Sequence, residues 1–391
     1  MKSNVALSVT DAQQESNSES NTTSRVAVAV LMVAHCAGML DLVALPVWVS
    51  TLSTAYKLDA QRAGGLVTCF LLGVVLSSLY FAPRLNRVRH RLAVPSGYAA
   101  AALAFGVCTF AKTFSVFLVL HLAAGLAIGC SLSLIHGRIG LGRNPHRLFA
   151  IVGLALGVFA IAFLATAPLA IAQHGGDTLF KIFAAVMLIA ALTTAVALPE
   201  STGAPLSATQ AELPFSRAVW LGMIGVSCMA LNQSMIFSFV LRIGIDRGFG
   251  LAAVTTVLVT LGVVNLFPSP LAAVLQRKLP SGVVLLVGPI TQAALALTIS
   301  NSLAFLPYAV ATCAYAGVMI FTHTFAFGTL AVVDKSGRAV AATPVMLMAG
   351  AAIGPVLGGS LVKSVGYSSL GAVSILVGLI AVICFSGLRR S

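Results

Sequence analysis

The strongest constraint on the fold of this chain is a series of twelve apolar runs, each close to the length of a membrane-spanning helix. A helix needs about 20 apolar residues to cross a bilayer, whereas a strand of a membrane barrel shows about 10 residues of alternating polarity. The runs here are continuous, which predicts helices. They cover residues 26–50, 64–83, 92–111, 114–138, 147–173, 179–198, 218–241, 251–275, 280–301, 304–333, 339–364 and 368–388.

The composition indicates that lipid is the solvent for most of this surface. Hydrophobic residues make up 59% of the 391 residues, and charged residues only 8%. Soluble domains carry about 25% charged residues, and no soluble fold can hide this much apolar surface. We therefore expect an all-α integral membrane protein with twelve transmembrane helices.

The formal net charge of +13 comes from basic residues in short loops between the runs, not from a patch with interleaved aromatic residues. This distribution excludes a nucleic-acid partner. The seven cysteines lie inside apolar runs and form no Cys-x-x-Cys pair, which is typical of packing residues. We predict no cofactor and no metal site.

The basic residues also predict the orientation, because cytoplasmic loops of membrane proteins are enriched in Lys and Arg. With the amino terminus placed inside, 16 of the 23 Lys and Arg residues fall on the cytoplasmic side. We expect both termini to be cytoplasmic, in a plasma membrane of the bacterial inner-membrane type.

A polar segment divides the runs into two sets of six. The prediction is a disordered cytoplasmic tail at 1–25, a six-helix bundle at 26–198, a cytoplasmic connector at 199–217 and a second bundle at 218–391. Two six-helix halves of parallel orientation are typical of one class of secondary transporters.

The loop after the second run, RLNRVRHR at residues 84–91, looks like the signature loop of the major facilitator superfamily. Asn86 stands where the family has an aspartate, and Arg89 where it has a glycine. The resemblance extends over the chain after residue 25 and implies two pseudo-symmetric six-helix halves. It also implies gating or structural roles for Asn86 and Arg87.

Three further motifs are similar to those of the drug and metabolite:proton antiporters of this superfamily. His121 precedes Gly125 in the fourth run, where those proteins place an arginine. The stretch GPVLGG at 354–359 resembles a glycine-proline pattern that they carry in the fifth span, and it implies structural roles for Gly354, Pro355 and Gly358. The first run combines Asp41 with an Ala-Leu-Pro sequence at 44–46, which is similar to their first-span motif.

Asp41 is the sharpest feature among the charged residues. Of the ten acidic residues, it alone lies inside an apolar run. A charge at the centre of a bilayer costs from about 3 to more than 10 kcal/mol, so such a residue is usually functional. The alternative is a structural clamp that holds neighbouring helices by hydrogen bonds.

Strongly polar residues concentrate on four of the twelve runs. Besides Asp41, they are His121 on the fourth, Asn232 and Gln233 on the seventh, and His323 on the tenth. Lipid-facing positions must stay apolar, so this clustering predicts a water-filled pathway, and the resemblance implies that these four spans line it. We predict substrate contacts for Asn232, Gln233, His323 and Trp48. Asn265 and Gln292 are the other strongly polar interior residues.

Asp41 and His121 form the predicted proton-coupling pair. A rise of 1.5 Å per residue places them about 5 Å and about 8 Å to the outer side of the middle of their spans, so they could meet across a cavity. Desolvation favours protonation of a carboxylate, and histidine titrates near neutral pH. The alternative for His121 is a neutral packing contact, which is also our interpretation of His35.

The leading functional prediction is a secondary transporter that exports a drug-like compound or metabolite in exchange for protons. The main alternative is a proton-coupled importer of a small organic solute. A copper or other soft-metal pathway along Met and Cys residues is a remote alternative. An enzyme is not expected, because no nucleophile-base set or metal cluster lies at membrane depth, and we expect a monomer.

Overall fold

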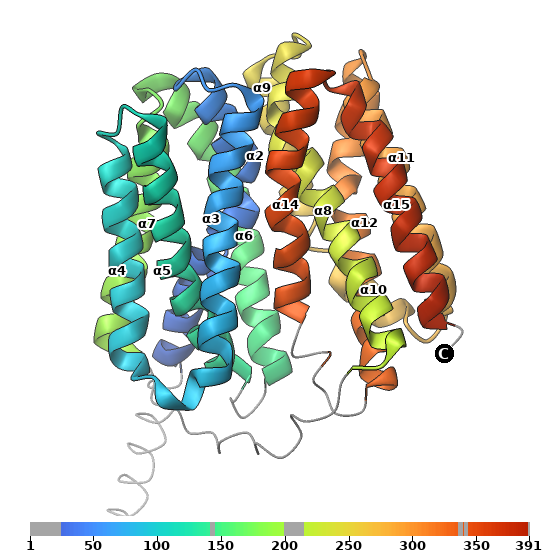
Figure 1. The fold of residues 1–391 in the computed structure, drawn as a ribbon, viewed down its shortest axis with the longest axis horizontal. Helices are drawn as coiled ribbons and strands as arrows, with labels where there is room; N and C mark the ends of the chain where they lie inside the picture. The colour runs from blue at the N-terminus through green and yellow to red at the C-terminus, as the bar shows by residue number, and fades with distance from the viewer. Residues whose placement is uncertain (1–24, 141–144, 199–214, 335–338, 340–342, 390–391) are drawn as a thin grey trace, which may run out of the picture.

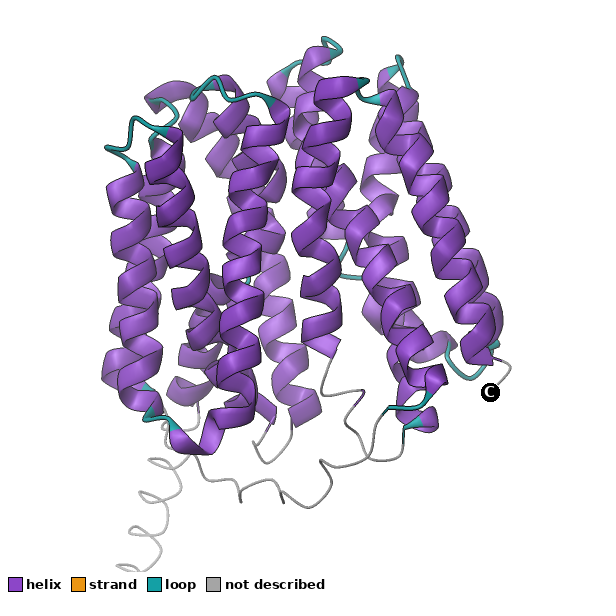
Figure 2. Cartoon of the chain, viewed as in Figure 1, coloured by secondary structure: helices purple, strands orange, loops and turns teal. Residues whose placement is uncertain are grey.

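The computed structural model describes residues 25–140, 145–198, 215–334, 339 and 343–389. This part of the chain contains helices and connecting turns but no strands (Figure 2). Twelve of its helical segments are long and apolar enough to cross a membrane. The prediction of a twelve-span, all-α membrane protein is therefore confirmed. The predicted tail and most of the predicted connector lie outside the described residues.

The first six spans form one group, which is coloured blue to green in Figure 1. The first span, Arg25–Thr54, consists of a helical segment at 25–38 followed by α2. The elements of this half are α2 (Leu40–Thr54), α3 (Ala60–Phe81), the short 3-10 helix η1 (Ala82–Arg87), α4 (His90–Cys108), α5 (Phe114–Gly140), α6 (Pro145–His174) and α7 (Thr178–Ala197).

The last six spans form the second group, coloured yellow to red. The elements are α8 (Arg217–Asp246), α9 (Leu251–Val264), α10 (Pro268–Leu275), α11 (Ser281–Asn301), α12 (Phe305–Val333), α14 (Thr343–Ser364) and α15 (Ser368–Arg389). We name the two ends of the molecule by described residues: the Asp59 end, at the top of Figure 1, and the η1 end, at the bottom.

The helix boundaries agree with the predicted runs except where polar residues extend a helix past its apolar stretch. The clearest case is α8, which continues to Asp246 rather than ending near residue 241. Asp246 Oδ2 forms an ion pair with Arg242 Nε, one turn earlier, at 2.8 Å. The partner charge makes this extra turn of helix favourable at the Asp59 end.

Two spans are interrupted near their middle. In the first span, Met39 leaves the helical region with φ −106° and ψ 19°, and its N–H donates to the carbonyl of His35 at 2.9 Å. The eighth span breaks between α9 and α10, where Pro268 begins the second helix because proline suits a first turn. Irregular backbone at membrane depth is tolerated only where protein or a cavity covers it.

The two halves touch closely where α3 lies beside α14 (Figure 1). A Cβ atom on Gly64 would overlap the carbonyl of Pro355, and one on Gly359 would overlap the carbonyl of Ala60. Small residues let helix backbones approach closely in a membrane, where packing and polar contacts drive association.

Polar contacts reinforce this junction at the Asp59 end. Lys363 Nζ lies 3.1 Å from Asp59 Oδ2 and 3.2 Å from Gln61 Oε1. The Val356 N–H donates to Thr68 Oγ1 at 3.1 Å. The halves are thus joined at the Asp59 end, whereas α3 and α14 diverge toward the η1 end in Figure 1.

Candidate transport cavity

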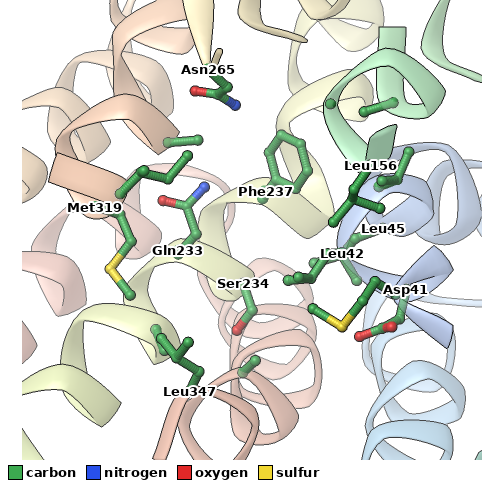
Figure 3. Close-up of a pocket in the computed structure, with 18 of the residues that line it drawn as sticks. Asp41, Leu42, Leu45, Leu156, Gln233, Ser234, Phe237, Asn265, Met319 and Leu347 are labelled. Carbon is green, nitrogen blue, oxygen red and sulfur yellow. The ribbon is translucent and has the colours of Figure 1, made fainter. Parts of the chain in front are cut away.

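A cavity of about 400 Å³ lies between the two halves and is lined by residues of both. Apolar side chains form most of its wall, with contributions from α2, α6, α8, α9, α12 and α14 (Figure 3). The strongly polar lining residues are few: Asp41, His136, Gln233, Ser234, Asn265 and His323. All but Asn265 lie on the first, fourth, seventh and tenth spans.

Asp41 lies in the first turn of α2, two residues after the break at Met39. Its side chain is buried, yet Oδ1 has no hydrogen-bond partner within the described protein. The helix N-terminus favours a negative charge at this position. Among the described residues that line the cavity it is the one acid, and none of them is Lys or Arg.

The facing wall carries uncharged hydrogen-bonding groups (Figure 3). Gln292 Nε2 donates to Gln233 Oε1 at 3.4 Å. This hydrogen bond orients the Gln233 amide and does not use the Nε2 group of Gln233. Asn265 Oδ1 and His323 Nδ1 are buried and have no hydrogen-bond partner within the described protein. Such groups need a water or a ligand group, because an unpaired buried polar atom is costly.

Of the predicted substrate contacts, Gln233 and His323 line the cavity, whereas Asn232 does not. Asn232 is fully buried away from the cavity, where its Nδ2 donates to the Ser374 carbonyl at 3.0 Å. Its own carbonyl accepts from the Tyr315 hydroxyl at 2.7 Å. Consecutive helical residues point about 100° apart, so Asn232 and Gln233 cannot face the same space. Asn232 joins α8 to α15 and α12.

His121 lies outside the cavity lining, and its buried Nε2 has no hydrogen-bond partner within the described protein, Asp41 included. Its Nδ1 bonds the Phe117 carbonyl at 2.7 Å within α5. Trp48, a predicted substrate contact, packs against the same ring at 5.4 Å between centroids and is also fully buried. The rest of this aromatic cluster consists of Phe70, Phe105, Phe117, Phe180 and Phe183.

The predicted pair fails to meet because the first span is longer than its apolar run. It continues to Thr54, which places Asp41 about 20 Å from the Asp59 end of its span. His121 follows the start of α5 by only seven residues, or about 10 Å. The depth estimate for Asp41 was wrong because polar residues after position 50 remain helical.

The structure adds His136, which the sequence analysis did not select. It lies near the η1 end of α5, where a membrane helix usually meets surface water, so no sequence signal placed it in a cavity. Its Nε2 lies 3.1 Å from Nδ1 of His35 on the first span. His35 is buried as predicted, but its partner is a cavity residue.

The predicted structural residues of α14 occupy helix contacts, whereas those of η1 do not show such contacts among the described side chains. On α14, Gly354 faces Ser234 and Gly358 faces Met235 of α8, while the Pro355 carbonyl faces Gly64. Arg87 is an exposed residue of η1. Asn86 belongs to η1 as well, and its side chain lies outside the described part of the structure. Within the described residues no group of three or more His, Cys, Asp or Glu side chains is arranged to hold a metal ion.

Two solved structures show the same fold. A bacterial homolog of the human lysosomal transporter Spinster, in an inward-facing unoccupied conformation, is 14% identical with a TM-score of 0.69, covering 94% of this chain and 97% of that one. The nucleoside transporter NupG is 15% identical with a TM-score of 0.69, covering 94% of this chain and 99% of that one. No curated protein matches the sequence.

Residues 30–333 match the family described as the Major Facilitator Superfamily. This match spans more than half of the chain, from within the first span to the end of the tenth. The chain therefore belongs to the Major Facilitator Superfamily and is an integral membrane transporter, not an enzyme.

Proposed function

We propose that this transporter exports a small amphipathic compound, neutral or basic, in exchange for protons. The observation that carries the proposal is Asp41: a buried acid in a mainly apolar cavity whose described lining holds no Lys or Arg. An anionic substrate would find no permanent positive charge there. An apolar body with a hydrogen-bonding or basic group fits the wall described above.

The chemistry of Asp41 supports exchange rather than simple passage. When the cavity closes, an ionised carboxylate loses its water, which is costly unless a proton or a cationic group accompanies it. A proton and a basic substrate therefore compete for the same site. The proton occupies Asp41 during inward movement and the substrate occupies it during outward movement, which couples the two movements.

The conformation also supports a cytoplasmic loading step. With both termini inside, the η1 end is the cytoplasmic end, and contacts at the Asp59 end close the opposite side. In this arrangement the substrate enters the cavity from the cytoplasm. Rocking of the halves about the cavity then exposes it to the outside.

The test compares the wild type with Asp41→Asn in proteoliposomes under an imposed pH gradient. Ethidium serves as a lipophilic cation and chloramphenicol as a neutral probe. A gradient of one pH unit sustains about tenfold accumulation for each exchanged proton, since tenfold corresponds to about 1.4 kcal/mol. We expect Asp41→Asn to abolish accumulation of a transported probe while exchange without a gradient persists.

Asp177→Asn is the matched control, because Asp177 lies between the fifth and sixth spans, where it pairs with Lys181 at 2.6 Å. We expect it to transport like the wild type. Full gradient-driven accumulation by Asp41→Asn would refute proton coupling at Asp41 and leave it as a structural clamp. Accumulation that requires the opposite gradient direction would identify an importer.

A further inference from the structure

Two imidazoles from different spans meet at the cavity wall. His35 Nδ1 and His136 Nε2 are 3.1 Å apart, and the ring centroids are 5.1 Å apart. His35 is buried, whereas His136 lines the cavity and packs its ring against Phe149 of α6 at 5.8 Å. The contact therefore joins the first span to α5 at the wall of the cavity.

A hydrogen bond between two imidazole nitrogens contains one proton. In the neutral pair, one ring donates and the other accepts. One added proton gives the pair a single positive charge and keeps the bond, because the charged ring still donates to the neutral ring. A second added proton would place two N–H groups face to face and break the contact. The pair therefore holds one exchangeable proton.

Asp41 is the one acid in the described parts of the first span, α4, α5 and α6. Several other titratable and charged groups lie on the neighbouring elements. Among the described side chains they are Arg25, Cys36 and Asp41 on the first span, His90, Arg91, Tyr98 and Cys108 on α4, His121, Cys130 and Arg138 on α5, Arg147 and His174 on α6, and His323 across the cavity. Tyr98 donates to the Ala34 carbonyl at 2.6 Å, and Arg138 lies 3.3 Å from His90 Nδ1. The basic residues of η1 are exposed.

The pair and Asp41 flank the same break in the first span. The carbonyl of His35 accepts the Met39 N–H at the end of the first helical segment, and Asp41 follows in the first turn of α2. Gly38, just before the break, packs so closely on Leu132 of α5 that a Cβ atom would lie 2.6 Å from its Cδ1. A movement of α5 against the first span therefore acts on the His35–His136 bond and on the start of α2 together.

We propose that the His35–His136 pair is a second proton site of the transport cycle, which exchanges its proton with water from the η1 end of the cavity. A proton on the pair supplies a positive charge on the opposite side of the break from ionised Asp41. Each cycle then moves one proton at Asp41 and one at the pair, and the pair exchanges its proton only in cycles in which Asp41 also exchanges one. This role rests on the proposed proton-coupled export, but proton binding by the pair does not.

The first experiment measures proton binding without any substrate. Nitrogen NMR of labelled histidines in the full-length protein, in lipid nanodiscs, follows the imidazoles between pH 5 and pH 9. We expect the His35 and His136 signals to move together in one step that takes up one proton. Independent titration, or no titration, of the two rings would overturn the proposal.

The variants His35→Asn and His136→Gln are designed to keep the contact. The asparagine amide reaches the position of Nδ1 and the glutamine amide that of Nε2, so each can hydrogen-bond but cannot take up a proton. Both should fold, as judged by Tm, and should lack the shared step. His174→Gln is the control, because His174 ends α6 away from the cavity lining.

The second experiment measures ethidium accumulation at fixed pH gradient and zero membrane potential. With one of two coupled protons lost, the accumulation ratio of His136→Gln should fall to about the square root of the wild-type ratio, since each proton contributes one factor of the gradient. An unchanged ratio would refute the coupled role of the pair. If Asp41→Asn retains accumulation while the shared NMR step is present, export coupling at Asp41 fails and the proton site at the pair stands.

Discussion

Asn232 and Gln233 are adjacent in the sequence but have unrelated roles. Gln233 faces the cavity, whereas the Asn232 side chain and carbonyl are used by α15 and α12. Buried polar groups in a membrane must find partners, so a polar residue inside a span is either satisfied by protein or placed where water and substrate reach it. The hydrogen bonds, rather than residue type, separate the two cases.

The same distinction applies to His121, for which we expect a packing role. Phenylalanine has a similar ring and suits the aromatic surroundings, so His121→Phe should keep the Tm within a few degrees and leave the pH profile of transport unchanged. His121→Ala should lower stability by about 2–4 kcal/mol, because it opens a cavity in a packed cluster. Thermal unfolding and transport at several pH values provide the measurements. Loss of pH dependence in His121→Phe would restore the predicted coupling role.

At the scale of elements, the two interrupted helices position the polar part of the cavity. Asp41 lies in the first turn of α2, just after the break of the first span, and Asn265 caps the C-terminus of α9 at the break of the eighth. A continuous helix uses its backbone groups internally, whereas a broken helix frees N–H and C=O groups near the break. Discontinuous helices at membrane depth are typical of transporter binding sites.

The contact between α3 and α14 gives a prediction at this scale. Gly64→Ala should push the halves apart at the Asp59 end, because the new methyl group would overlap the backbone carbonyl of Pro355, which cannot move aside as a side chain can. Spin labels on the Asp59 ends of α3 and α14 should show a longer distance or a broader distribution. Gly65→Ala is the matched control, since a Cβ there meets no atom within 4 Å. Equal distances in both variants would show that this contact does not hold the end closed.

At the scale of the whole molecule, pH should act on the cavity and not on the closure of the Asp59 end. The N–H of Arg62, and then Lys363, hold the pKa of Asp59 below its ordinary value. Because the pKa is lowered, the Asp59 carboxylate is ionised and paired with Lys363 at every pH above its ordinary pKa, near 3.9. The ion pair is lost only when the pH falls through the lowered pKa of Asp59. Between pH 5 and pH 9 this closure should stay charged.

The topology provides the second prediction at this scale. Single cysteines replacing Lys57 or Arg247, in a variant without the seven native cysteines, should react with a membrane-impermeant reagent added outside whole cells. A cysteine at position 210, which lies outside the described residues, should react only after the membrane is opened. Labelling of position 210 from outside would reverse the proposed orientation and make the observed closed end cytoplasmic.

The sequence by itself determined the class of fold, because the length and continuity of an apolar run are local properties that the thickness of a bilayer converts directly into a span. It also marked Asp41, since a lone acid in such a run is costly wherever the helix packs. Only the tertiary structure decided which polar residues meet. The faces of Asn232 and Gln233, the depth of His121 and the contact between His35 and His136 depend on how helices rotate, break and shift against one another. Those shifts are set by packing between residues more than a hundred positions apart, such as Gly64 against Pro355, and a local pattern carries no record of them.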